Sequence, residues 1–297
     1  MQAQHTVRSF DEDLNYLVTK IAEMGGHAER MIENSVKALT KSDSKLAQAV
    51  IADDKFLDVT QREVDERAIF TIARRQPMAI DLREIIGSIR ISNDLERIGD
   101  MGKNIAKRSF AVSESRHPTK LYRSIEALSD LALTQLKDVL DAYASRSVDR
   151  LDQVRDRDDE IDALYTSLFR ELLTYMMEDP RNITACTHLL FCAKNLERVG
   201  DHATNIAETV YYIVTGTQMS AERPTDDTSH ELTVEKVCRV RCERQPPKAF
   251  RRGSALFRMK KPLPNCCGTI WNRRDSKLTH ILAAMWPKPG FAIRCRT

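Results

Sequence analysis

Eight acidic residues recur in two similar sets along this chain. Each set joins an Asp-x-x-x-Asp pair to a later Glu-x-x-x-Asp pair. The sets are Asp54, Asp58, Glu96 and Asp100, followed by Asp158, Asp162, Glu197 and Asp201. Carboxylates four positions apart share one face of a helix. All-oxygen ligation without His or Cys suits Mg, Mn or Fe, and Zn less typically. We therefore predict that these eight residues bind metal ions.

Residues beside the carboxylates are candidates for a supporting shell. Asn104 and Asn205 continue the two four-residue ladders. The other candidates are Arg97, Arg198 and His202, although a plain surface role for His202 is the stronger expectation. A second interpretation stays open: the two arginines and neighbouring lysines could neutralise the acids as a surface salt-bridge network.

The Glu-x-x-x-Asp pairs belong to a longer duplicated motif. Residues 95–106 read LERIGDMGKNIA, and residues 196–207, 101 positions later, read LERVGDHATNIA. Eight of the twelve positions are identical. A period of this length is that of a small domain copied once rather than of a solenoid repeat.

Apolar residues in both motifs recur with helical spacing. Leu95, Ile98 and Ile105 form one seam, and Leu196, Val199 and Ile206 form its counterpart. The acidic ladders lie one position round from these seams, so we expect them to face outward. Gly99 and Gly200 occupy the same place in both ladders, which indicates that a neighbouring helix or a bound ion approaches the backbone there.

Proline turns bring the two halves of each acidic set together. Asp58 lies 19 residues before Pro77, and Glu96 lies 19 after it. Asp162 lies 18 residues before Pro180, and Glu197 lies 17 after it. An antiparallel helical hairpin therefore places each Asp pair beside the matching Glu/Asp pair.

Six long helical patterns predict an all-α protein. The first covers residues 8–41, and the second follows the break at 42–44 and ends at about Arg75. The other four cover residues 79–111, 119–145, 148–178 and 181–214. Short connections between long helices favour antiparallel neighbours. We expect two tandem three-helix bundles related by a pseudo-twofold axis, with domains at 1–112 and 113–230. Gly25 and Gly26 within the first helix indicate close packing or a kink.

Residues 231–297 differ from the rest of the chain. They hold 16 Lys/Arg against 4 Asp/Glu, five of the seven Cys and six of the ten Pro. Three interpretations compete: an arm for nucleic acid or an anionic membrane, a Cys metal knuckle, and a disordered or non-native extension, which we favour. The chain shows neither a signal peptide nor an apolar run of about 20 residues, so we expect a soluble cytoplasmic protein.

The doubled LERxGDxxxNIA pattern, each copy paired with an upstream Asp-x-x-x-Asp, resembles the PhoU family over about residues 5–228. The resemblance implies a regulator that represses phosphate uptake and the phosphate-starvation response when phosphate is plentiful. It implies contacts with the ATPase subunit of the phosphate ABC transporter and with a sensor histidine kinase. It also implies metal clusters on the bundle surface, a homodimer, peripheral association with the inner membrane through these partners, and no direct contact with nucleic acid.

Two other functional classes compete with a regulator. A di-iron helical-bundle enzyme would place Glu-x-x-His motifs inward, whereas the positions three after Glu96 and Glu197 are Gly99 and Gly200. No nucleophile elbow or phosphate-cradling glycine loop is present, so we expect no enzyme activity. A metal-free scaffold protein is the third interpretation.

Overall fold

The computed structural model describes residues 8–113 and 119–219, and these residues form helices joined by short turns. The predicted all-α class is confirmed. The long helices are α1 (Arg8–Lys41), α2 (Ser44–Arg75), α3 (Ile80–Ser113), α4 (Thr119–Ser145), α5 (Leu151–Glu178) and α6 (Ile183–Thr215). Asp43 caps α2, because its side chain accepts hydrogen bonds from the backbone of Lys45 and Leu46.

Three helix starts were predicted too early. Ala79 has φ of 44°, a left-handed conformation that no helix can include, so α3 begins at Ile80. Residues 148–150 form a turn before α5. Pro180–Asn182 form a 3-10 turn before α6, and the Asp179 side chain accepts a hydrogen bond from the Arg181 backbone there. Turn geometry, rather than hydrophobic periodicity, sets these boundaries.

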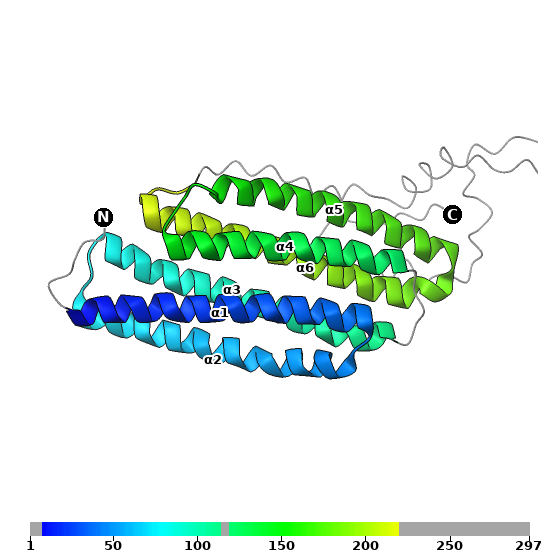
Figure 1. The fold of residues 1–297 in the computed structure, drawn as a ribbon, viewed down its shortest axis with the longest axis horizontal. Coiled ribbons are helices and arrows are strands. Elements are labelled where there is room, and N and C mark those ends of the chain that lie inside the picture. Colours follow the sequence, from blue (N-terminus) through cyan, green and yellow to red (C-terminus); the bar gives the residue numbers. More distant parts are fainter. Residues whose placement is uncertain (1–7, 114–118, 220–297) are drawn as a thin grey trace, which may run out of the picture. The chain divides into compact units, whose positions relative to one another are not determined.

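The six helices form the two three-helix bundles predicted from the sequence, and both bundles lie within one compact unit. Helices α1, α2 and α3 pack against one another, and so do α4, α5 and α6. The bundles meet mainly where α3 packs on α6, with α1 also contacting α4 (Figure 1). Helices α3 and α6 make the larger contact between the bundles and also pack on both helices of their own bundle, so they occupy the centre of the body.

Contacts between α3 and α6 define their register. His202 contacts Asp94, and His188 contacts Arg108. The residue number falls along α6 as it rises along α3, so the two helices run antiparallel. Combined with the 101-residue repeat, this register places the pseudo-twofold axis at the level of Ile98 and Val199. The duplicated motifs therefore lie side by side at the middle of the body.

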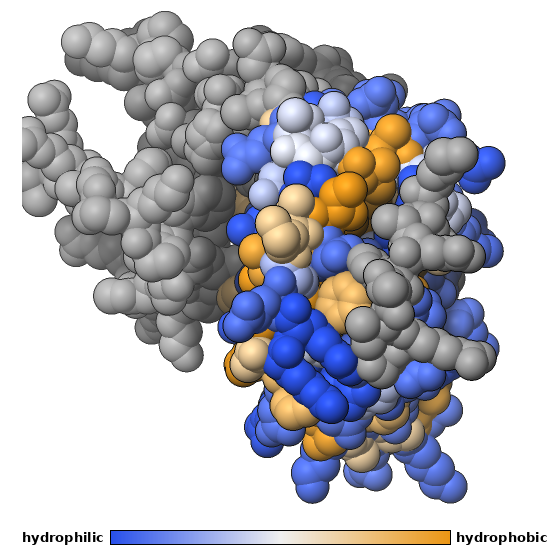
Figure 2. Space-filling view, turned by 90° about the vertical axis from the view of Figure 1, so that its left-hand side faces the viewer, coloured by the Kyte–Doolittle hydropathy of each residue, from blue (hydrophilic) through white to orange (hydrophobic). Residues whose placement is uncertain are grey.

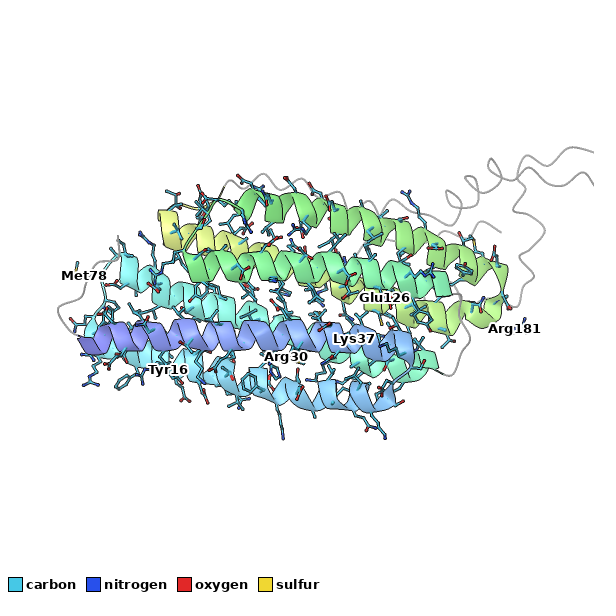
Figure 3. The ribbon with its side chains drawn as sticks, in the orientation of Figure 1. Tyr16, Arg30, Lys37, Met78, Glu126 and Arg181 are labelled. Carbon is cyan, nitrogen blue, oxygen red and sulfur yellow. The ribbon has the colours of Figure 1, made fainter. Side chains whose placement is uncertain are left out.

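The two hairpin turns point to opposite ends of the six-helix body. Figure 3 labels Met78 in the α2–α3 turn at one end and Arg181 beside the α5–α6 turn at the other. Met78 is 80% exposed and Ile80 is 58% exposed. Figure 2 views this end of the body, where apolar patches lie between hydrophilic ones.

Several earlier predictions lie outside the described residues. The junction between the two predicted domains falls next to residues 114–118, and the extension at 231–297 falls within 220–297, neither of which is described. The three interpretations of that extension therefore stay predictions. Of the described helices, none carries an apolar stretch long enough to cross a bilayer.

Candidate metal-binding site

The α2–α3 hairpin brings the four carboxylates of the first set together. Burial raises the pKa of Glu96 above its ordinary value, and the negative charge of Asp100 raises it further. Asp58 and Asp54 on α2 add smaller contributions in the same direction. Asp54 itself is buried, with 7% of its surface exposed. The proline-turn spacing thus places these side chains correctly relative to one another.

Two cations lie among the acids of the first set. The ammonium group of Lys103 forms ion pairs with Asp54 and, at 3.5 Å, with Asp100. The hydrogen bond to Asp54 raises the pKa of Lys103. Arg97 approaches Glu96 at 3.5 Å and Asp100 at 3.9 Å. The salt-bridge network of the alternative interpretation is therefore present here.

The α5–α6 hairpin brings together the second set, in which Glu197 is the most buried member. The pKa of Glu197 is raised to about 7, chiefly by burial, with Lys194 lowering it and the charges of Asp201 and Asp162 contributing to the rise. Lys194 Nζ lies 2.5 Å from Glu197 Oε1. The other oxygen, Oε2, is buried without a hydrogen-bond partner among the described residues. This cluster thus contains an unsatisfied buried oxygen.

Asp158 joins the second set from the neighbouring turn of α5. Its Oδ1 accepts a hydrogen bond of 3.4 Å from Gln135 Nε2 on α4. A Cβ atom at Gly200 would lie only 3.1 Å from this oxygen. At Gly99, a Cβ atom would clash with Leu57 of α2. Both ladder glycines therefore allow a neighbouring helix to approach the backbone. This is one of the two predicted reasons for glycine at these positions, the other being a bound ion.

The expectation that the ladders face outward is wrong for Glu197, and two residues of the Asp pairs, expected on the hairpin surface, are buried as well. Asp54, Asp162 and Glu197 are buried, at 7%, 9% and 5% exposure. Glu197 lies next to the apolar seam of α6, where α5 covers it. Asp54 on α2 and Asp162 on α5 lie toward α3 and α6, because Asp54 pairs with Lys103 and Asp162 acts on Glu197. Asp201 is exposed, as expected.

The predicted supporting residues differ in their contacts and in their exposure to solvent. Arg97 contacts the first set, whereas Arg198 is exposed to solvent. Asn104 and Asn205 are half-buried. His202 Nδ1 lies 2.9 Å from Asp94 Oδ1 on α3, so its side chain joins the two bundles.

Two lysines and one glutamine at the site were not singled out from the sequence. Lys103 lies three residues after Asp100, and Lys194 lies three residues before Glu197. This spacing places each ammonium group one helical turn from a carboxylate, which is a signal that a search for i, i+3 pairs would find. No local pattern marks Gln135, because it comes from another helix.

The donor set fits a hard cation. In the described part of the chain, no three His, Cys, Asp or Glu side chains are already arranged as a metal site. The pKa values of Glu96 and Glu197 are nevertheless raised, and Glu197 Oε2 lacks a partner. A divalent ion would lower these pKa values, because its positive charge stabilises ionised carboxylates. It would also give Glu197 Oε2 a partner, because hard cations bind oxygen ligands.

Comparison with known proteins identifies both halves of the body. A family model described as the PhoU domain matches residues 21–109 and again residues 125–210. The chain is 64% identical over 232 residues to the phosphate-specific transport system accessory protein PhoU homolog of Rhizobium meliloti (strain 1021), covering 78% of this chain and 98% of that protein. It is 50% identical over 221 residues to the homolog of the same name from Caulobacter vibrioides, covering 74% of this chain and 96% of that protein.

Solved structures share the fold. The crystal structure of PhoU from Pseudomonas aeruginosa matches with a TM-score of 0.68 and 38% identity, over 70% of this chain and 100% of that one. The phosphate transport system regulatory protein PhoU from Streptococcus pneumoniae matches with a TM-score of 0.65 and 25% identity, over 71% of this chain and 99% of that one.

Proposed function

The chain belongs to the PhoU family, and from this we propose that it is a cytoplasmic negative regulator of phosphate uptake and of the phosphate-starvation response. It acts between the ATPase subunit of the phosphate ABC transporter and a sensor histidine kinase, which hold it at the inner membrane. The observation that carries this proposal is the 64% identity over 98% of a relative named as an accessory protein of phosphate-specific transport. The names of the relatives are those of accessory and regulatory proteins rather than enzymes.

A genetic complementation experiment tests the regulatory role. A bacterium lacking its own PhoU gene would carry a reporter controlled by a phosphate-starvation promoter. We expect the reporter to stay active in phosphate-rich medium, and expression of this chain to switch it off. Continued reporter activity despite normal amounts of the folded protein would contradict the proposal.

We further propose that the two acidic sets bind divalent metal ions, with Fe, Mn, Mg and Zn as the candidates. Asp54, Asp58, Glu96 and Asp100 would hold one site, and Asp158, Asp162, Glu197 and Asp201 the other. A bound cation would neutralise the carboxylates and present a defined charged surface to a partner or to phosphate. The buried, unpartnered Oε2 of Glu197 is the structural feature that favours this over salt bridges alone.

Metal analysis with matched variants tests the two sites. Glu96→Gln with Asp100→Asn, and Glu197→Gln with Asp201→Asn, should each reduce the bound metal, measured by elemental analysis of protein purified without a histidine tag. The control is Glu126→Gln with Asp130→Asn, another acidic pair four residues apart, both exposed on α4. Equal metal content in all variants would place the ions elsewhere, and a wild-type protein without bound metal would favour the metal-free scaffold.

We also propose that the chain works as a homodimer, which its family membership favours. Contacts with the transporter and the kinase would then be made by a symmetric pair of subunits. Sedimentation or light scattering of the full chain tests this part separately from the genetic experiment.

A further inference from the structure

The outward face of α2 exposes four large apolar side chains. Phe56 is 40% exposed, Val59 52%, Ile69 64% and Phe70 49%. Their spacing of three, ten and one residues keeps them within one side of a helix with 3.6 residues per turn. We call this side, with the charged residues between them, the outer α2 face. An exposed apolar surface of this kind marks a contact with another molecule.

This face contributes little to the bundle, apart from the Phe56 ring, whose centroid lies 4.4 Å from that of the His27 ring on α1. Helix α2 buries its opposite side, including Leu57 and Val64, against α1 and α3. Figure 1 places α2 on the side of α1 and α3 away from α4, α5 and α6, which agrees with the helix contacts. The outer α2 face is therefore directed away from the second bundle.

The second repeat provides an internal comparison. Helix α5 occupies the position of α2 in the other bundle, yet its exposed positions are polar or small. They include Glu160, Ala163, Ser167 and Arg170. Among the described residues, no large apolar side chain of α5 counts as exposed. The same architecture is thus stable with a polar outer helix, so the apolar side chains of α2 have another use.

The charges within the outer α2 face form a self-complementary pattern. Arg62 and Glu66 are both exposed, and neither pairs with another residue in the described ranges. Along the helix the order is apolar, apolar, basic, acidic, apolar, apolar: Phe56, Val59, Arg62, Glu66, Ile69 and Phe70. Reversing this order and exchanging the charges reproduces it. A surface that must match its own rotated copy requires such a pattern.

We propose that a second copy of this chain docks on the outer α2 face, with the two α2 helices antiparallel across a twofold axis. This inference rests on the homodimer in the proposed function and specifies the surface that forms it. In the register that sets Arg62 opposite Glu66 of the partner subunit, Val59 lies opposite Ile69 of the partner subunit. The symmetry repeats both contacts, so four apolar side chains and two ion pairs meet from two helices.

The length of the outer α2 face indicates how tightly the two copies should bind. From Phe56 to Phe70 the helix rises about 21 Å at ~1.5 Å per residue. A single helix-to-helix contact of this length lies at the small end of specific interfaces, so we expect a dissociation constant on the order of micromolar. The dimer should separate on dilution.

Charge exchange between the two positions tests the proposed register. Arg62→Glu alone and Glu66→Arg alone each place like charges opposite one another twice. We expect each to raise the dimer dissociation constant about tenfold or more in sedimentation velocity of the full chain. The double variant, and an equal mixture of the two single variants, should restore dimers, because opposite charges meet again. Arg170→Glu on α5 is the matched control and should leave the constant unchanged.

The outcomes separate this inference from the rest of the proposed function. A dimer that neither charge reversal weakens would overturn the outer α2 face as the interface and leave the homodimer standing. A wild-type chain that stays monomeric at about 100 µM would overturn both, since a micromolar dimer is nearly complete there. The reporter experiment decides the regulatory role independently of either result.

Discussion

Glu197 is a carboxyl group placed where burial opposes its charge. Its pKa of about 7 lies above the ordinary value of 4.5, because the side chain is buried beside Asp201 and Asp162. Between these two pH values, the folded protein holds a proton that the unfolded chain has lost. The stability that depends on this group is therefore complete below pH 4.5 and declines as the pH rises to about 7.

A pH series on metal-free protein measures this effect. We expect Glu197→Gln to match the wild type near pH 4.5 and to exceed its free energy of unfolding by about 1–3 kcal/mol at pH 8. Urea unfolding monitored by circular dichroism gives both values. A constant difference between the two proteins across this range would mean that Glu197 titrates normally.

Arg146 shows a second residue-level conflict. Its φ of 53° lies in the left-handed region, where glycine is favoured, as does that of the exposed Ser42. The guanidinium group of Arg146 pairs with Glu84, whose side chain is only 5% exposed. The ion pair explains why a strained arginine, rather than glycine, follows α4.

Glycine substitutions separate backbone strain from the ion pair. Ser42→Gly should raise the free energy of unfolding by about 0.5–1 kcal/mol, because it only relieves strain. Arg146→Gly should lower it by about 1–3 kcal/mol, because it removes the Arg146 cation from the buried Glu84 carboxylate. Chemical unfolding of both variants provides the comparison, and a gain in stability from Arg146→Gly would show that the ion pair contributes little.

At the scale of elements, the approach of α1 to α4 depends on one of two adjacent glycines. A Cβ atom at Gly25 would lie 2.7 and 2.8 Å from the two methyl groups of Leu140. A Cβ atom at Gly26 would meet nothing closer than Arg30, at 3.6 Å. The close-packing interpretation of this pair therefore holds for Gly25, whereas Gly26 has room for a side chain.

Two alanine variants measure the energetic effect of this packing. Both replace glycine by alanine within α1 and so gain the same helix propensity, but only one of them adds a methyl group against Leu140. Gly26→Ala should raise the free energy of unfolding by about 0.5–1 kcal/mol. Gly25→Ala should lower it by about 1–2 kcal/mol, because Leu140 must shift or the bundles must separate slightly. Thermal and urea unfolding give both values, and an equal gain from the two variants would rule out a tight contact between α1 and α4.

At the scale of the whole molecule, metal binding should be linked to stability. An ion that binds only the folded hairpins stabilises them by about 2.7 kcal/mol at a hundredfold excess over its Kd. For a body of this size we expect Tm to rise by about 5–10 °C on addition of Mn²⁺ and to return with chelator. Differential scanning calorimetry measures the shift.

The variant Glu96→Gln, Asp100→Asn, Glu197→Gln, Asp201→Asn is the control for this shift, because it removes two predicted ligands from each site. It should show no rise in Tm with Mn²⁺, and without metal it should be at least as stable as the wild type. An identical rise in this variant would place the ions elsewhere.

The amino-acid sequence by itself determined the helices, their duplication and the pairing of the carboxylates within each hairpin. These features depend on periodicity and on counting from a proline turn, which are local properties. Asp58 and Glu96 are close because they are equally distant from Pro77, whatever surrounds them.

Only the tertiary structure decided which of those carboxylates are buried and what pairs with them. Glu197 and Asp201 belong to the same ladder, yet the first is buried and the second exposed. His202 pairs with Asp94, a residue 108 positions away in the other bundle. The reason is that burial depends on which helices cover each side of a helix. Helix α5 covers Glu197, and α3 reaches His202 only when the two bundles pack together.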